Sequence, residues 1–300
     1  MSRVAWAREL AGSTAVLVVA LWLVWSTAFV AIKVGLRHAD PYTFTLLRVV
    51  AALLVLVLAV AVRGRWQRLG SRRLHAYAVA LGATNVAGFL VFQNAGLADA
   101  PIGVGSVLIY TQPFLVALGA WLLRGETLRL GQVAGMVLGW LGVVIVVVGE
   151  LDVGSTPARA VVFLLLSALS WAAGTLVFTA VPRELSVLDV LLLMNLYGVV
   201  PIALLVAAGV GPGPTADWDT TLVACALWAG AGASIGGLGL QFLLLRRGKA
   251  GVVSSWTFAV PVLAAAQGVV LLGEDAHGAL LLGGAAVAAG IWLVNRRPAR

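Results

Sequence analysis

The segment SVLIYTQPFLVALGAWLLRGE, residues 106–126, returns later in the chain as SSWTFAVPVLAAAQGVVLLGE, residues 254–274. Both copies are apolar, carry a proline near the middle and end in Gly-Glu. The glutamate follows the proline by thirteen positions in each copy, from Pro113 to Glu126 and from Pro261 to Glu274. When residues 102–126 are aligned with 250–274, nine of twenty-five positions are identical. The chain therefore contains an internal duplication.

The duplication extends beyond this segment. The displacement of 148 residues that aligns the two copies also pairs Gln93 with Gln241, Gly135 with Gly283 and Gly142 with Gly290, and a displacement of 146 pairs Trp25 with Trp171. We interpret the chain as two repeats, residues 1–150 and 151–300.

The composition excludes a water-soluble fold. Hydrophobic residues make up 61% of the chain, charged residues 11%, and the mean hydropathy is +1.03, whereas soluble domains are roughly 45–50% apolar and about 25% charged. We expect an all-α integral membrane protein whose surroundings are the lipid bilayer. Cys225 is the single cysteine, so no disulfide or thiolate metal site forms within the chain; no metal or cofactor is expected.

Charged or Pro/Gly-rich loops divide the chain into ten predicted transmembrane helices of about the length that spans a bilayer. They are residues 14–36, 42–62, 74–97, 102–123, 130–149, 158–181, 187–209, 220–245, 250–272 and 277–294. The first stretch is longer than a signal-peptide core and lacks a small-x-small cleavage site, so we interpret it as a retained span.

The basic residues fall on one side of these spans. If the amino terminus is cytoplasmic, sixteen of the twenty Lys and Arg residues lie on the inside: Arg3, Arg8, Arg63, Arg65, Arg68, Arg72, Arg73, Arg124, Arg129, Arg183, Arg246, Arg247, Lys249, Arg296, Arg297 and Arg300. The positive-inside rule then places both termini in the cytoplasm of a bacterial-type inner membrane. The net charge of +8 is explained by this orientation, and no nucleic-acid partner is expected.

Five spans per repeat is an odd number, so the second repeat must enter the membrane from the opposite side. Inverted repeats are a recurring design of secondary transporters, with the substrate site near the midplane between the halves. Proline in a spanning helix removes a backbone hydrogen bond, which is tolerated beside protein or a water-filled cavity. Pro113 and Pro261 are therefore candidate hinges, or else kinks that helix packing shapes.

The repeats resemble a known family. WSTAFVAIKVGL (25–36) followed by ADPYTFTLLR (39–48), GVGSVLIYTQPFLVALGAWLLRGE (103–126) and GVVSSWTFAVPVLAAAQGVVLLGE (251–274) are similar to the two EamA repeats of the drug/metabolite transporter superfamily. Ser26 departs from the glycine that the family more often has there. The second copy has Thr179 and Met194 where the first has Lys33 and Arg48, so any cationic site is one-sided.

This resemblance implies ten helices around a central cavity lined by helices 1, 3, 4, 6, 8 and 9. It also implies export of amino acids or related metabolites by alternating access, as in the YddG-type amino acid exporters. Small metabolites, and among them amino acids including aromatic and hydrophobic ones, are the expected substrates. A carrier of anionic sugar-phosphate or nucleotide-sugar-like metabolites is the alternative, favoured if Lys33 and Arg48 both face the cavity. A non-transporting scaffold or sensor is a third reading.

Candidate cavity residues follow from helical spacing. Trp22, Trp25, Ser26, Phe29 and Lys33 share one face of the first helix, where they either contact a solute or pack a neighbour while Lys33 reaches the interface. Arg48 lies about six residues inside the second helix and has no acidic partner there, so it needs water, a carbonyl or a bound anion, or clamps the outer loop. The remaining candidates are Asn85, Tyr110, Trp171, Thr175, Trp256 and Phe258.

Several absences bear on function. We find no HExxH, paired Asp motif, Gly-x-Ser-x-Gly elbow or cysteine pair, so we expect no enzyme. No Asp or Glu lies deep in a predicted span, so the carboxylate relay of a proton pump is not visible. Gly131, Gly135 and Gly139 have GxxxG-like spacing, which serves either a dimer contact or tight packing within one chain; we expect a monomer or weak homodimer.

Overall fold

The computed structural model describes residues 3–62, 69–100, 102–148, 156–210, 215–272 and 278–296. The first half of the chain forms α1 (Arg3–Gly35), α2 (Pro41–Val62), α3 (Arg72–Leu81), a π-helical segment (Gly82–Gly88), α4 (Phe89–Asp99), α5 (Ile102–Ile109), α6 (Gln112–Arg124) and α7 (Leu130–Val148). The second half forms α8 (Ala158–Thr179), α9 (Val187–Ala207), α10 (Thr220–Leu227), a π-helical segment (Trp228–Gly237), α11 (Leu238–Leu245), α12 (Ala250–Ser255), a 3-10 turn (Trp256–Phe258), α13 (Ala259–Leu272) and α14 (Gly278–Asn295).

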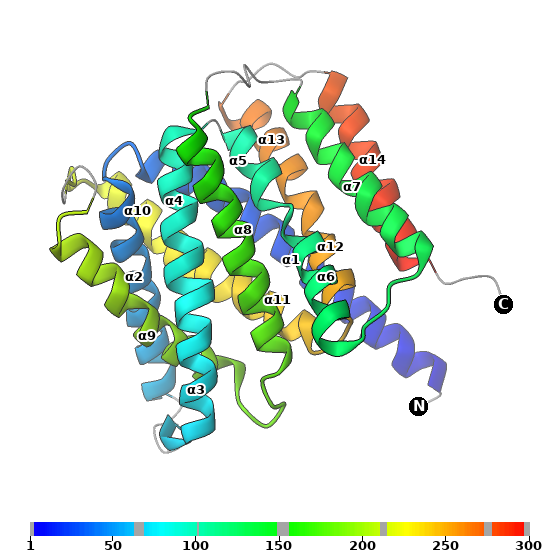
Figure 1. The fold of residues 1–300 in the computed structure, drawn as a ribbon, viewed down its shortest axis with the longest axis horizontal. Helices are drawn as coiled ribbons and strands as arrows, with labels where there is room; N and C mark the ends of the chain where they lie inside the picture. Colours follow the sequence, from blue (N-terminus) through cyan, green and yellow to red (C-terminus); the bar gives the residue numbers. More distant parts are fainter. Residues whose placement is uncertain are drawn as a thin grey trace.

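These elements form a bundle of ten helical stretches (Figure 1), because several labelled helices continue into one another. Seven stretches are long and apolar enough to cross a membrane. Three shorter apolar helices, Leu130–Ile145, Ala250–Ala264 and Leu281–Asn295, lie where the fifth, ninth and tenth spans were predicted. The all-α, ten-helix prediction is confirmed.

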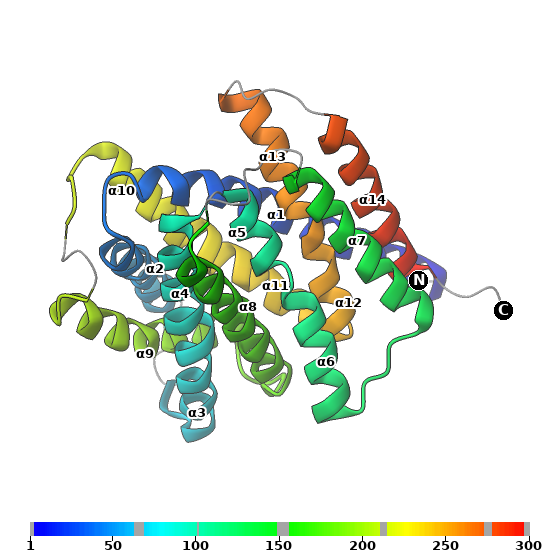
Figure 2. The ribbon, with the colours of Figure 1, turned by 45° about the horizontal axis from the view of Figure 1, so that its top comes forward.

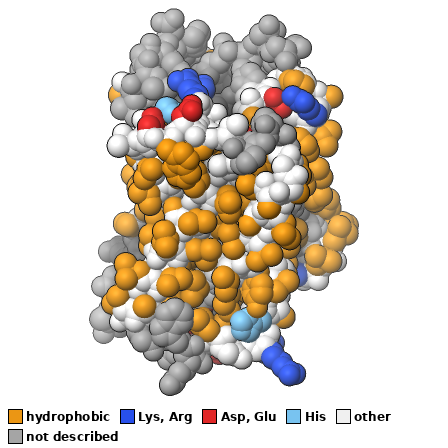
Figure 3. Space-filling model, turned by 90° about the vertical axis from the view of Figure 1, so that its left-hand side faces the viewer, with side chains coloured by type: hydrophobic (Ala, Val, Ile, Leu, Met, Phe, Trp, Pro, Cys, Tyr) orange, Lys and Arg blue, Asp and Glu red, His pale blue; other side chains and the backbone are white. Residues whose placement is uncertain are grey.

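The outer surface suits a lipid environment. Figure 3 shows hydrophobic side chains over the middle of the face that α2 and α9 form, with charged side chains at its two ends. Leu54, Leu58 and Leu204 are about two-thirds exposed there, at 66%, 64% and 65%. In a bilayer these apolar side chains lie against hydrocarbon.

Three of the predicted spans differ in the structure. The first helix begins at Arg3 and not near residue 14. The fourth span, predicted as one helix, stops at Ile109 and resumes at Gln112. The ninth span is interrupted at the equivalent place by the 3-10 turn Trp256–Phe258. Both interruptions directly precede a proline, which lacks the N–H that an unbroken helix would use.

The glycine of the Gly-Glu pair ends α6. Gly125 has φ of 63°, and its N–H bonds to the carbonyl of Trp121 at 3.0 Å while the N–H of Glu126 bonds to that of Ala120 at 3.2 Å. A left-handed residue with these two bonds is the usual glycine stop of a helix. The second copy of the pair, Gly273 and Glu274, lies outside the described residues.

The two halves run in opposite directions. α7 and α14, the last spans of the two repeats, lie side by side in both views (Figures 1 and 2). A Cβ added to Gly135 would lie 2.7 Å from the carbonyl oxygen of Gly290, and one added to Gly142 would lie 2.6 Å from that of Gly283. Contacts therefore advance along α7 as they recede along α14, so the helices are antiparallel. The duplication pairs Gly135 with Gly283 and Gly142 with Gly290, so the two contacts are copies of each other.

A second pair of contacts repeats the same exchange. Gly82 opens the first π-helical segment and packs against the backbone of Met194 and Gly198 in α9. Gly230, its equivalent in the second π-helical segment, packs against the backbone of Arg48 and Ala52 in α2. These are the residues that a displacement of 146 pairs with Met194 and Gly198. Each half thus packs its third span on the second span of the other half.

The GxxxG-like glycines of α7 serve packing within one chain. Gly135 and Gly139 contact Gly290 of α14, and Gly139 also contacts the Phe258 ring. A Cβ on Gly131 would have no heavy atom within 4 Å.

Gly135 and Gly131 therefore form a matched pair of positions in α7, one in contact with α14 and one without a neighbour. Gly135→Ala should lower stability by about 1–3 kcal/mol because the methyl group forces α7 away from α14. Gly131→Ala should be neutral or stabilising, because alanine is the better helix former by about 1 kcal/mol. Thermal unfolding of both variants in detergent measures the difference, and equal unfolding temperatures would contradict the α7–α14 contact.

Candidate functional site

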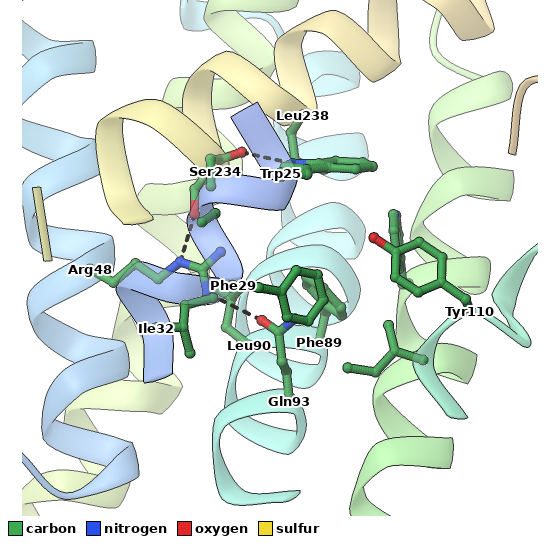
Figure 4. A pocket seen from close by; sticks show the side chains of 14 residues that line it. Trp25, Phe29, Ile32, Arg48, Phe89, Leu90, Gln93, Tyr110, Ser234 and Leu238 are labelled. Carbon is green, nitrogen blue, oxygen red and sulfur yellow. Dashed lines mark hydrogen bonds between the residues drawn. The ribbon is translucent and has the colours of Figure 1, made fainter. Parts of the chain in front are cut away.

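A cavity lies between the two halves. It is lined by Trp25, Ala28, Phe29, Ile32, Arg48, Phe89, Leu90, Gln93, Ile109, Tyr110, Trp171, Ala233, Ser234 and Leu238. These residues come from α1, α2, α4, α5 and the turn that follows it, α8, the second π-helical segment and α11 (Figure 4). The cavity measures about 40 Å³, enough for roughly three water molecules.

Aromatic rings form one wall, with Trp171 at their centre. Its ring centroid lies 5.1 Å from that of Trp25, 5.1 Å from that of Phe89 and 6.0 Å from that of Tyr110. The Trp25 and Tyr110 rings meet Trp171 edge to face, an arrangement that aromatic quadrupoles favour. Phe29 adds a ring 6.3 Å from Tyr110.

The two tryptophans are held by their ring N–H groups. Trp25 donates to the carbonyl oxygen of Ala233 at 3.2 Å, and Trp171 donates to Oε1 of Gln241 at 3.3 Å. Both rings are almost completely buried. Because the N–H groups are satisfied, what Trp25 and Trp171 offer to a solute is mainly apolar ring surface.

Arg48 provides the charge of the cavity. It is 4% exposed, and its Nε donates to the carbonyl oxygen of Ala229 at 3.0 Å and to Oγ of Ser234 at 3.1 Å. One Nη donates to Oε1 of Gln93 at 3.2 Å. None of the carboxylates that the structure describes is within ion-pair distance of it. A central charge in a membrane helix costs roughly 2.5–3.5 kcal/mol on insertion scales, and neutral partners offset only part of this cost.

The predicted stripe of α1 divides between two environments. Trp25 and Phe29 line the cavity, whereas Trp22 donates to the carbonyl oxygen of Trp256 at 2.7 Å. Ser26 accepts from Nε2 of Gln267 at 2.9 Å. Lys33 is exposed and does not line the cavity.

The other candidates divide in the same way. Arg48, Tyr110 and Trp171 line the cavity. Asn85 is buried against Gly174, and Thr175 accepts from Nε2 of Gln112 at 3.4 Å. The last two candidates take part in packing: Trp256 donates to Oδ1 of Asn295 at 3.2 Å, and the Phe258 ring lies 6.1 Å from that of Phe114. A substrate contact by any of the twelve stays a prediction.

The expected set of lining helices needs one correction. None of the described residues of the ninth span lines the cavity, whereas the second span does so through Arg48. In the described conformation the side chains of Trp256 and Phe258 instead contact other helices. The Trp256 ring N–H donates to Asn295 of α14, and the Phe258 ring lies beside Phe114 of α6 and Gly139 of α7.

A pair of stacked rings lies beyond the cavity toward one end of the bundle. Phe178 of α8 and Phe242 of α11 lie 3.7 Å apart, centroid to centroid, at 9°. Each is one or two turns beyond a cavity residue, Trp171 or Leu238, on its helix. The Arg246 guanidinium lies 5.6 Å from the Phe178 centroid and donates to the carbonyl oxygen of Leu185 at 2.6 Å. We call this side of the bundle the Arg246 end.

The Arg246 end of the bundle is positively charged. Partial burial, and then the charge of Arg183, lowers the pKa of the Arg246 guanidinium, with Glu184 opposing. Arginine nevertheless keeps its charge at physiological pH, so Arg246 remains a cationic cap on the stack.

The opposite side, which we call the Asp40 end, is tied by loop backbone. Asp40 donates its N–H to the carbonyl oxygen of Thr215 at 3.0 Å, and the N–H of Thr215 donates to an Asp40 carboxylate oxygen at 3.0 Å. His38 Nδ1 lies 3.2 Å from a carboxylate oxygen of Asp219. The loop after α1 is thus joined to the segment that leads into α10.

The model of the EamA-like transporter family matches residues 12–148 and 158–296, which is nearly the whole chain in two segments. The chain belongs to the EamA-like transporter family. This assignment, within the drug/metabolite transporter superfamily, confirms the resemblance noted from the sequence.

Several similar proteins are named as transporters or exporters. The EamA chain is 26% identical over 286 residues to the "Uncharacterized transporter YvbV" of Bacillus subtilis, covering 95% of this chain and 92% of that protein. It is 29% identical over 291 residues to a "Probable amino-acid metabolite efflux pump" of Salmonella typhimurium, covering 94% and 93%. It is 28% identical over 278 residues to a "Probable terminal-alkyne amino-acid exporter" of Streptantibioticus cattleyicolor, covering 91% and 90%.

A solved crystal structure shares the fold. It superposes on the EamA chain with a TM-score of 0.77 at 20% sequence identity, covering 94% of this chain and 97% of the other.

Sequence reasoning missed part of the wall. Phe89 and Ser234 were not among the candidates, and Gln93 was noted only as the duplicate of Gln241. Phe89 lies one turn before Gln93 on α4, and the duplicated glutamines pointed to that helix. Ser234 lies in the run AGAGASIGG, whose small residues gave no chemical signal.

The position of the Trp25 ring depends on a glycine that packs against it, and this contact can be tested. A Cβ on Gly237 would overlap the Trp25 ring, whereas one on the neighbouring Gly236 would lie 3.7 Å from its nearest neighbour, the carbonyl oxygen of Ala231. Gly237→Ala should therefore destabilise the protein by about 1–3 kcal/mol and displace Trp25, and Gly236→Ala should not. Thermal unfolding and tryptophan emission test this; identical spectra and melting temperatures for the two variants would contradict the contact.

Proposed function

We propose that this EamA-family protein is a secondary transporter that exports small metabolites, most of all hydrophobic and aromatic amino acids, by alternating access. One observation carries the proposal: a cavity with aromatic walls and one buried arginine lies between two oppositely oriented repeats. The names of the Salmonella and Streptantibioticus relatives support amino acids as the substrate class. No enzymatic activity is proposed, and one chain supplies the whole cavity, so the monomer is the proposed transport unit.

The two ends of the bundle would open in turn. In the described conformation the stacked rings of Phe178 and Phe242 lie beyond the cavity residues of α8 and α11, toward the Arg246 end, and we take them as the closed gate of that end. The Arg246 end also carries most of the described basic residues, so we place it on the cytoplasmic side of a bacterial inner membrane. Loading from the cytoplasm then requires the two rings to separate. Pro113 and Pro261, beside the interruptions of the fourth and ninth spans, are the proposed hinges.

The alternative of an anionic sugar-phosphate carrier has weaker support. That reading was favoured if two cationic side chains faced the cavity, but Arg48 lines it and Lys33 does not. A single guanidinium matches a solute with one carboxylate better than a phosphate dianion.

Counterflow in proteoliposomes tests the function. Vesicles loaded with unlabelled phenylalanine, leucine or another amino acid of a panel should accumulate the same labelled amino acid transiently and saturably. Flux for sugar phosphates but not amino acids would support the alternative carrier. No flux for any solute would favour a scaffold or sensor and overturn the proposal.

Two tryptophans distinguish the cavity from the periphery. Trp171→Ala removes the centre of the aromatic wall and should reduce counterflow at least about tenfold at equal membrane insertion, which corresponds to about 1.4 kcal/mol. Trp140 of α7 packs against Phe114 of α6, at 6.1 Å between ring centroids, and it is not part of the cavity lining. Trp140→Ala should retain most flux at equal membrane insertion, and equal flux in the two variants would contradict the proposed cavity.

A further inference from the structure

Arg48 and its surroundings define what kind of solute the cavity accepts. We propose that Arg48 binds the carboxylate of the transported solute, and that the carboxylate rather than the amino group is what the site recognises. This inference rests on the proposed function, because it takes the cavity to be the transport site. It narrows the solutes to monocarboxylates with an apolar body, a class that includes hydrophobic amino acids.

The guanidinium has donors left for a ligand. Of its five N–H groups, the hydrogen bonds to Ala229, Ser234 and Gln93 use Nε–H and one N–H of a terminal nitrogen. The remaining three N–H groups are not used by any described residue. Arg48 lines the cavity, and a carboxylate accepts two parallel N–H groups from one guanidinium.

The partners of Arg48 orient its charge without neutralising it. A backbone carbonyl, a hydroxyl and an amide oxygen are all neutral, and they hold the side chain from α4 and from the second π-helical segment. A structural clamp of this kind would be equally served by a neutral donor such as glutamine. A buried cation without a carboxylate among the described residues is instead suited to an anion that arrives and leaves.

The rest of the cavity has the opposite character. Figure 4 shows Arg48 and Gln93 on one side, Tyr110 on the other, and the rings of Trp25, Phe29 and Phe89 between them. A solute whose carboxylate contacts Arg48 therefore places its body against aromatic rings. Among the described lining residues none is acidic, so an ammonium group meets only neutral acceptors, such as the oxygens of Gln93, Ser234 and Tyr110, and the faces of aromatic rings.

The test compares solutes that share a phenethyl group and differ in the charge of the group attached to it. Competition against labelled phenylalanine counterflow is measured with 3-phenylpropionate, its neutral amide 3-phenylpropanamide, and phenethylamine. A charged hydrogen-bonded pair corresponds to roughly a ten- to hundredfold difference in affinity. We expect 3-phenylpropionate to compete at least about tenfold better than its amide, and phenethylamine to compete as poorly as the amide. Equal competition by the acid and the amide in the unaltered protein would overturn the proposal.

Variants then assign the preference to Arg48. Arg48→Gln should bring the acid-to-amide ratio to within about twofold, and Arg48→Lys should retain an intermediate preference, because lysine keeps the charge but not the bidentate fork. Arg159→Gln is the matched control, since Arg159 is exposed and pairs with Asp99 at 3.1 Å; its ratio should be unchanged. A preference that survives in Arg48→Gln contradicts the assignment.

Two further outcomes separate this inference from the proposed function. If Arg48→Gln does not fold, quenching of tryptophan emission in the unaltered protein by the acid and the amide still measures the preference. Carboxylate-selective quenching without counterflow of any solute would retain the Arg48 site and reject transport. Counterflow of phenylalanine without carboxylate preference would retain transport and reject the Arg48 site.

Discussion

Direct backbone contact at glycine holds the two halves together. Gly135 meets Gly290 and Gly142 meets Gly283, while the π-helical segments pack through Gly82 and Gly230 on α9 and α2. Helices in a bilayer gain little from burying apolar side chains against one another, so close approach at small residues and dispersion contacts stabilise their association. Because each contact has a copy related by the duplication, the antiparallel orientation of the halves follows, and with it a cavity at their interface.

The cavity exists because the two halves have diverged at equivalent positions. Arg48, Ile32 and Asn94 of the first half correspond to Met194, Phe178 and Phe242 of the second. Ile32 lines the open cavity. At the equivalent position of the other half, Phe178 stacks on Phe242. Exchange of the two conformations would open the space at Phe178 and fill the space at Ile32. The asymmetry of the side chains makes one end the closed end in the described conformation, and it places the only charge of the described lining on one side.

The sequence predicted the architecture well because the architecture follows from composition and from the repeat. The ten apolar spans, the odd number of spans in each half and the repeated glycines can all be read from the amino-acid sequence. Five of the twelve candidate residues, Trp25, Phe29, Arg48, Tyr110 and Trp171, line the cavity. Helical spacing put Trp25 and Lys33 on the same face of α1, but it could not show that only Trp25 reaches the cavity. The stripe from Trp22 to Lys33 runs eleven residues along α1 and passes from the cavity to the surface. Trp256 and Phe258 are not among the lining residues of the described conformation; they lie in a 3-10 turn that helical spacing did not indicate, and their contact with a substrate stays a prediction.

Access to the cavity from its two ends tests the account most directly. In a Cys225→Ser background, single cysteines at Ile32 and at Thr175, which lies one helical turn from Phe178 of the stack, would be labelled by a membrane-impermeant maleimide from either side of oriented vesicles. We expect Ile32→Cys to react from the Asp40 side and Thr175→Cys only from the Arg246 side, with saturating phenylalanine changing the two rates in opposite directions. Rates that rise or fall together, or labelling of both positions from one side, would contradict a cavity that alternates between two inverted halves.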